Sequence, residues 1–60
     1  MRPSEIVLLM NRLGWTRDKL ASEVGVRVRT VYRWQTGEAA PSRLATRRLD
    51  QIKRENLKDE

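Results

Sequence analysis

The stretch VGVRVRTVYRWQTGE, residues 24–38, decides between a strand and a helix. Apolar and basic residues alternate at its start, as they do in a half-buried strand. The alternation then stops, and Val28, Val31 and Trp34 recur at the spacing of one helix face. A strand here would have no second strand to pair with. The pattern therefore predicts a helix over about residues 28–36, which depends mainly on packing because its β-branched residues have a low helix propensity.

Glycines and a proline divide the remaining chain into further helices. Apolar side chains recur at helical spacing on both sides of the central stretch, and Leu44 is expected to join the apolar face of the last helix. These helices are predicted over about residues 4–13, 16–24 and 42–56. Hydroxyl side chains suit N-terminal ends and glycine suits C-terminal ends. The expected N-caps are Ser4, Thr16 and Ser42, and the expected C-caps are Gly14, Gly25 and Gly37.

The composition excludes several classes of function. Sixty residues form one domain at most and leave no room for a deep substrate pocket. The chain has neither Cys nor His, which excludes disulfides, zinc sites built from these residues and catalysis by them. We therefore expect no enzyme, no cofactor or metal, and no small-molecule ligand. No apolar run approaches the roughly 20 residues that span a bilayer, so we expect no membrane association and a cytoplasmic location.

The charge favours an acidic partner. The formal net charge is +5, and arginine outnumbers lysine by ten to three. Arginine is the better bidentate partner for phosphate and guanine. A GC-rich genome would produce the same preference for arginine, and this alternative stays open.

Residues 16–37 combine two short helices with a tight turn. Ala21 is small enough to let the second helix approach the first, and Gly25 permits a positive φ at the turn. This is the pattern of a helix-turn-helix. The segment GWTRDKLASEVGVRVRTVYRWQTGEAAPS resembles the phage repressor and Cro-type helix-turn-helix DNA-binding domains. The resemblance covers roughly residues 4–52, and the shared residues are Gly14, Thr16, Leu20, Ala21, Gly25, Val26, Thr30, Val31, Arg33, Trp34, Gly37, Glu38, Pro41 and Ser42.

The resemblance implies an all-α, lambda-repressor-like DNA-binding domain that occupies residues 1–60. It would be a compact bundle of four helices, or of five if the end of the chain adds one. Relatives often carry Gln where this chain has Arg17, and a Ser N-cap where it has Arg27, which is a poor cap. Several relatives have a fifth helix, where this chain has only a charged tail, about residues 53–60, that is expected to fray.

The predicted helix over residues 28–36 would present a basic outer face. With Val31 and Trp34 directed to the core, arginines and a tyrosine point outward with no carboxylate between them. A helix of this size fits the major groove, with its N-terminal residues at the base edges. The predicted base-reading residues are Arg27, Val28, Arg29 and Tyr32, with Arg29 on guanine and the apolar groups on a thymine methyl. The predicted phosphate contacts are Thr16, Arg17, Arg33, Thr36 and Arg43.

Each of these assignments has a plainer alternative. The spacing of Val28 is also compatible with burial. Arg29 could be an ordinary solvated arginine, and Tyr32 could be a surface ring that packs on arginine stems. Four basic residues near the end of the chain are interpreted as the solvent face of the last helix: Arg47, Arg48, Lys53 and Arg54.

The expected function is sequence-specific binding of double-stranded DNA, as a transcriptional regulator and specifically a repressor. One subunit reads only a few base pairs, so we expect a homodimer, at least on DNA, on a pseudo-palindromic operator with half-sites about 34 Å apart. The alternative is a small helical protein-interaction module, such as an antitoxin-like or adaptor subunit. An RNA-binding domain is less favoured because the chain lacks aromatic surfaces for base stacking.

Overall fold

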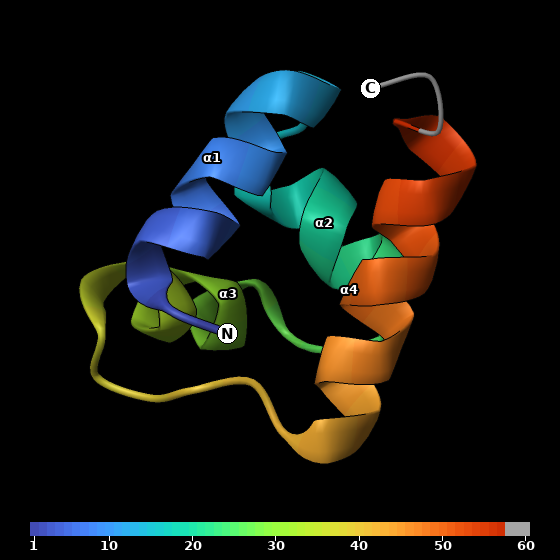
Figure 1. The fold of residues 1–60 in the computed structure, drawn as a ribbon. Helices are drawn as coiled ribbons and strands as arrows, with labels where there is room; N and C mark the ends of the chain where they lie inside the picture. The colour runs from blue at the N-terminus through green and yellow to red at the C-terminus, as the bar shows by residue number, and fades with distance from the viewer. Residues whose placement is uncertain (58–60) are drawn as a thin grey trace.

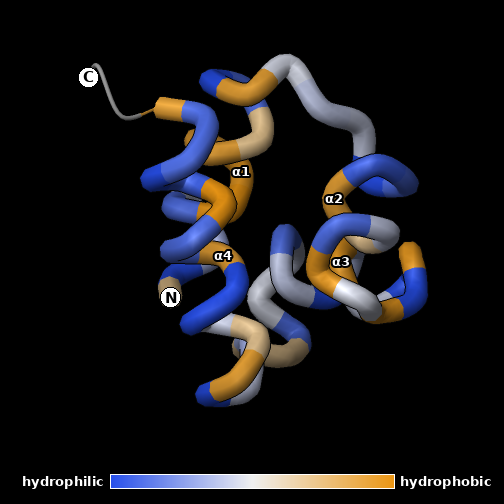
Figure 2. The backbone as a smooth tube through the Cα atoms, turned by 90° about the vertical axis from the view of Figure 1, so that its right-hand side faces the viewer, coloured by the Kyte–Doolittle hydropathy of each residue, from blue (hydrophilic) through white to orange (hydrophobic). Residues whose placement is uncertain are grey.

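The fold was obtained as a computed structural model, which describes residues 1–57. This part of the chain forms four α-helices and no strand: α1 (Pro3–Leu13), α2 (Arg17–Val24), α3 (Val28–Thr36) and α4 (Arg43–Asn56). Figure 1 shows α3 lying across the end of the molecule where α4 begins. Figure 2 shows α1 and α4 on one side of the molecule and α2 and α3 on the other. The predicted all-α architecture is confirmed, and the central stretch is helical.

The N-terminal ends of α2 and α4 are capped as the sequence predicts. The Thr16 hydroxyl accepts a hydrogen bond from the backbone N–H of Lys19, and the Ser42 hydroxyl accepts one from that of Ala45, each at 3.2 Å. α3 begins after Arg27, whose side chain makes no capping bond, in agreement with its poor capping chemistry. The weak start of α3 therefore depends on tertiary packing.

The prediction that Ser4 caps α1 is wrong. α1 begins one residue earlier, at Pro3, and the N-cap is Arg2, which has no side-chain capping bond. Proline is favoured at the first helical position because its φ is already helical and it has no N–H to satisfy. Pro3 therefore sets the start of α1 and places Ser4 inside the first turn.

The predicted tail, about residues 53–60, overlaps the end of α4. α4 ends at Asn56, as the sequence predicts, so residues 53–56 of the predicted tail are helical. A fifth helix is absent from residues 1–57, and the rest of the predicted tail, residues 58–60, lies outside the described residues. The apolar face of α4 continues to Ile52, which is buried and helps to explain why the helix extends this far.

All four helices contribute side chains to one core. Its ten buried members are Ile6, Leu9, Met10, Leu20, Ala21, Val31, Trp34, Ala45, Leu49 and Ile52. Leu44 is not among them: it is 75% exposed, so the prediction that it joins the apolar face of α4 is wrong. Successive helical residues lie about 100° apart, and burial of Ala45 turns its neighbour toward solvent. α3 packs against both α1 and α2, and α2 also contacts α4.

Both tryptophans pack on this core, in different surroundings. Trp34 of α3 is 3% exposed. Trp15, which precedes α2, is half-buried against the core, and the Lys19 ammonium lies 5.3 Å from the centre of its ring. Within residues 1–57, no helix is both long and apolar enough to cross a membrane.

Candidate nucleic-acid interface

α3 has one buried face and one exposed face. Val31 and Trp34 are buried, which confirms the predicted inward face of this helix. Val28 is 43% exposed and Tyr32 is 49% exposed, so the alternative that Val28 is buried is wrong. We call the exposed side chains of α3 the outer face, and they are Val28, Arg29, Tyr32, Arg33 and Thr36.

The start of α3 adds positive character to the outer face. Arg27 is exposed at the N-cap position, and the first turn of α3 holds no acidic residue. The free backbone N–H groups of a helix N-terminus carry a partial positive charge, which acts in the same sense as the arginines beside it. Within residues 1–57, Arg29 forms no ion pair, so its guanidinium is presented to solvent without a carboxylate partner.

Arg17 connects the start of α2 with the outer face. Its guanidinium carbon lies 5.1 Å from the centre of the Tyr32 ring. A cation–π contact at an exposed position is worth about 0.5–1 kcal/mol. The contact brings together one predicted phosphate-binding residue and one predicted base-reading residue. It also agrees with the plainer interpretation of Tyr32 as a ring packed on an arginine.

A shallow hollow lies where the end of α1, the start of α2 and α3 meet. It is lined by Met10, Thr16, Arg17, Asp18, Val28 and Gln35. Gln35 donates a hydrogen bond from Nε2 to the Met10 sulfur at 3.3 Å. Gln35 is not among the predicted site residues, although its position seven residues after Val28 places it on the same side of α3. The exposed carboxylate of Asp18 opposes anion binding in this hollow.

Arg33 is already paired within the chain. Its Nε lies 3.2 Å from a carboxylate oxygen of Glu38. Thr36 supports the loop that carries Glu38, because its hydroxyl accepts a hydrogen bond from the Glu38 N–H at 3.4 Å and donates one to the Arg33 carbonyl at 3.2 Å. An anion that binds Arg33 must therefore compete with Glu38, and the Thr36 hydroxyl has a structural role.

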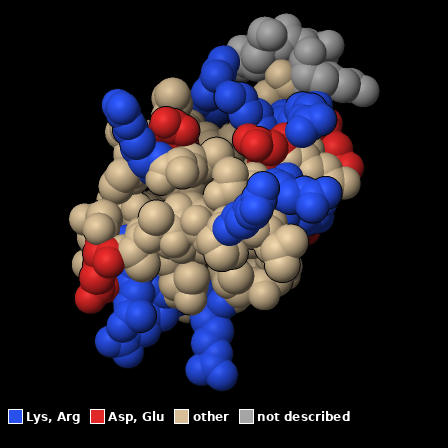
Figure 3. Space-filling model, turned by 60° about the horizontal axis from the view of Figure 1, so that its bottom comes forward, with Lys and Arg blue, Asp and Glu red and all other residues tan. Residues whose placement is uncertain are grey.

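The other two predicted phosphate contacts lie at helix starts. Thr16 is exposed, and its hydroxyl oxygen is engaged in capping α2. Arg43 is exposed at the first residue of α4, which Figure 1 shows at the same end of the molecule as α3. Figure 3 views this end and shows Lys and Arg side chains standing out around an area that carries neither charge.

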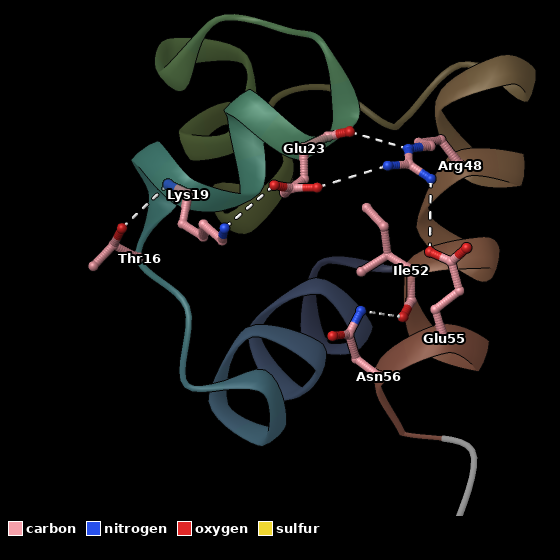
Figure 4. Close-up of polar contacts among 7 residues, drawn as sticks. All are labelled: Thr16, Lys19, Glu23, Arg48, Ile52, Glu55 and Asn56. Atoms are coloured by element: carbon pink, nitrogen blue, oxygen red, sulfur yellow. Dashed lines mark hydrogen bonds and ion pairs between the residues drawn. The ribbon is translucent and has the colours of Figure 1, made fainter.

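Arg48 is half-buried and does not belong to the solvent face of α4, where the sequence analysis placed it. Its Nε donates a hydrogen bond of 3.0 Å to the backbone carbonyl of Glu23, and its guanidinium lies 3.7 Å from the Glu23 carboxylate and 3.9 Å from that of Glu55 (Figure 4). The last turn of α2 has no basic residue of its own. Arg48 thus supplies the cation that the C-terminal end of a helix favours, and it ties α2 to α4.

The described residues offer no cluster of three or more His, Cys, Asp or Glu side chains that could hold a metal ion. No family model, no curated protein and no solved structure matches this chain.

Proposed function

We propose that the chain binds double-stranded DNA sequence-specifically, with α2 and α3 acting as a helix-turn-helix and α3 lying in the major groove. The single observation that carries this proposal is the outer face of α3. That face presents two arginines, an aromatic ring, a valine and a hydroxyl, while the opposite face is buried. The major groove offers acceptors on guanine and methyl groups on thymine, which match these groups.

The roles of the arginines differ with their surroundings. Arg29 has no carboxylate partner among the described residues and is assigned to a bidentate contact with guanine. Arg17, Arg33 and Arg43 are assigned to phosphates, with Arg33 exchanging Glu38 for a phosphate oxygen. Three phosphate contacts predict a slope of about −2.7 per subunit in a plot of log affinity against log salt concentration.

A short helix covers only a few base pairs, so a second subunit is needed for a specific site. We propose a homodimer on a pseudo-palindrome whose half-sites lie about one helical turn apart. A protein that occupies such a site without further chemistry acts as a transcriptional regulator, and as a repressor where the site overlaps a promoter.

Selection from a pool of random duplexes tests this proposal. The wild-type chain is expected to enrich one motif, and Arg29→Ala should lose about 5- to 150-fold in affinity for it, which is the worth of one bidentate base contact. Arg54→Ala is the matched control, because Arg54 is an exposed arginine on α4 and its loss changes the net charge equally. Equal binding to every duplex, or an equal loss of affinity in both variants, would contradict base reading and show that the outer face acts only as a non-specific basic surface.

A second candidate function is a protein-interaction module, and exposed apolar side chains on α1 favour it. Val7 and Leu8 are both exposed there. Replacing both with serine should leave DNA binding unchanged if α3 carries the function. A chain that binds no duplex but co-purifies with one protein, and loses it on this double substitution, would support the module instead.

A further inference from the structure

The exposed face of α1 carries an acid and a base on either side of an apolar residue. Glu5, Leu8 and Arg12 follow one another at intervals of three and four residues, which places them on one face of the helix. All three are exposed and line one hollow. Seven residues separate the acid from the base, which is about 10 Å along the helix axis. A second α1 that runs antiparallel to the first would therefore meet an acid with a base at both ends.

The apolar part of this surface extends beyond Leu8. Val7 and Leu8 are 39% and 55% exposed, and Met1 and Leu57, which are half-buried against the core, line the hollow beside Leu8. The hollow has a volume of about 150 Å³, below the roughly 300–1,000 Å³ of small-molecule pockets. It therefore suits an apolar side chain of a protein partner better than a small molecule.

The charges of this surface favour a second copy of the chain as the partner. Within residues 1–57, the Glu5 carboxylate forms no ion pair. A partner with charges of one sign would be attracted at one end of the α1 face and repelled at the other. A second copy offers both signs, and a two-fold axis across α1 reverses their order.

The exposed face of α1 points away from the outer face of α3. α1 packs against α3, and the Met10 sulfur accepts a hydrogen bond from Gln35 of α3. Leu8 lies two residues before Met10, so the two side chains point to opposite sides of α1. Figure 2 also shows α1 and α4 on the side of the molecule opposite α2 and α3. A second copy seated on α1 would therefore leave both outer faces uncovered.

We propose that two copies of the chain associate through the exposed faces of two antiparallel α1 helices, and that this contact joins chains bound to two separate DNA segments. Leu8 of each copy enters the hollow of the other, and Glu5 of each copy lies opposite Arg12 of the other. The contact is additional to the pairing of two subunits on one operator. It rests on the proposed function only for what the outer faces bind.

Association without DNA is tested by exchanging the charges. One helix face buries less than the roughly 800 Å² per partner of a stable complex, so we expect a dissociation constant of about 0.1 mM or weaker. Glu5→Arg and Arg12→Glu each place like charges opposite one another at both ends, so each variant alone should associate about 5- to 30-fold more weakly than the wild type. In an equimolar mixture, every pair between the two variants again joins an acid to a base, and wild-type affinity should return.

Sedimentation equilibrium measures these affinities, and circular dichroism checks that each variant is folded. The matched control is Arg47→Glu, because Arg47 is an exposed arginine on α4 and its replacement changes the net charge as Arg12→Glu does. A mixture of Arg47→Glu with Glu5→Arg should not regain affinity. The chain has a net charge of +5, so a general effect of net charge would weaken Glu5→Arg and strengthen Arg12→Glu.

Bridging of DNA is tested with an immobilised duplex and a fluorescent duplex that both carry the motif enriched by the chain. The wild type should capture the fluorescent duplex on the immobilised one. The Val7→Ser, Leu8→Ser double variant should bind a single duplex with wild-type affinity and lose this capture.

The outcomes separate this inference from the proposed function. A wild-type chain that stays monomeric up to about 1 mM, or a charge-exchanged mixture that regains no affinity, would overturn the contact and leave DNA binding intact. Capture that persists in the Val7→Ser, Leu8→Ser variant would also overturn it. Association that responds to the charge exchange in a chain that binds no duplex would remove the proposed function and keep the contact.

Discussion

Replacing Glu38 with glutamine is expected to tighten the binding of DNA. The Glu38 carboxylate lies 3.2 Å from Nε of Arg33, and the two side chains are 63% and 47% exposed. An ion pair at this exposure is worth about 0.2–1 kcal/mol. A phosphate that binds Arg33 must first displace the carboxylate. Glutamine keeps the shape of the side chain and removes the charge, so the dissociation constant should fall by about 1.4- to 5-fold.

The measurement is a titration of a labelled operator duplex followed by fluorescence anisotropy, at several salt concentrations. The matched control is Glu55→Gln, because Glu55 is also exposed and lies 3.9 Å from an arginine, Arg48, but is on α4. Both substitutions change the net charge by the same amount. A long-range electrostatic effect would act in both variants and fade with salt, whereas the release of Arg33 acts in Glu38→Gln alone.

Unchanged or weaker binding by Glu38→Gln, with Glu55→Gln behaving identically, would refute the assignment of Arg33 to a phosphate. Folding provides an internal check on this conclusion. Loss of one exposed ion pair should lower the free energy of unfolding by less than about 1 kcal/mol. The Thr36 hydroxyl bonds to the backbone of residue 38 and is unaffected by the substitution, so the loop keeps its support.

Three further substitutions test the fold. Leu49→Ala removes a fully buried side chain and should lower the free energy of unfolding by about 3–5 kcal/mol, which is most of the stability expected for a 60-residue chain. Urea denaturation should show a largely unfolded variant, and a loss under about 1 kcal/mol would contradict the position of Leu49 in the core. Gly25→Ala creates no close contact but places a Cβ at φ +88°, so the free energy of unfolding should fall by about 1–2 kcal/mol, measured by thermal unfolding. A stabilised variant would contradict the left-handed conformation at this turn. Arg48→Gln leaves the Glu23 carbonyl without its donor and should cost about 0.5–1.5 kcal/mol in the same assay, and an unchanged melting temperature would show that the tie between α2 and α4 contributes nothing.

Helix positions were predictable because they depend on local chemistry. Thr16 and Ser42 cap their helices because their hydroxyls accept hydrogen bonds from N–H groups three residues further on. Gly25 ends α2 because glycine adopts the positive φ of this position without a steric cost. The error at Ser4 arose from a competing local preference, that of Pro3 for the first helical position. The inward face of α3 followed from periodicity alone.

Contacts between helices were not predictable in this way. Arg48 contacts Glu23, which lies 25 residues earlier in the sequence. The helical spacing of apolar residues does not distinguish Arg48 from Arg47, the exposed arginine before it. The contact between Arg17 and Tyr32 depends on how α2 and α3 cross, which the pattern of each helix does not fix. The pairing of Arg33 with Glu38 depends on the path of the loop after α3. Residue types on the outer face were thus predictable, but their existing partners were not.

The different settings of the two tryptophans give the protein two built-in optical reporters. Trp34, sealed in the core, should emit at short wavelength and resist quenching by acrylamide, so its emission follows the docking of α3. Trp15, half-open to water beneath the Lys19 ammonium, should emit farther to the red and be quenched readily. If α3 loosens from the other helices, the short-wavelength fluorescence of Trp34 should therefore change while the emission of Trp15, just before α2, stays constant.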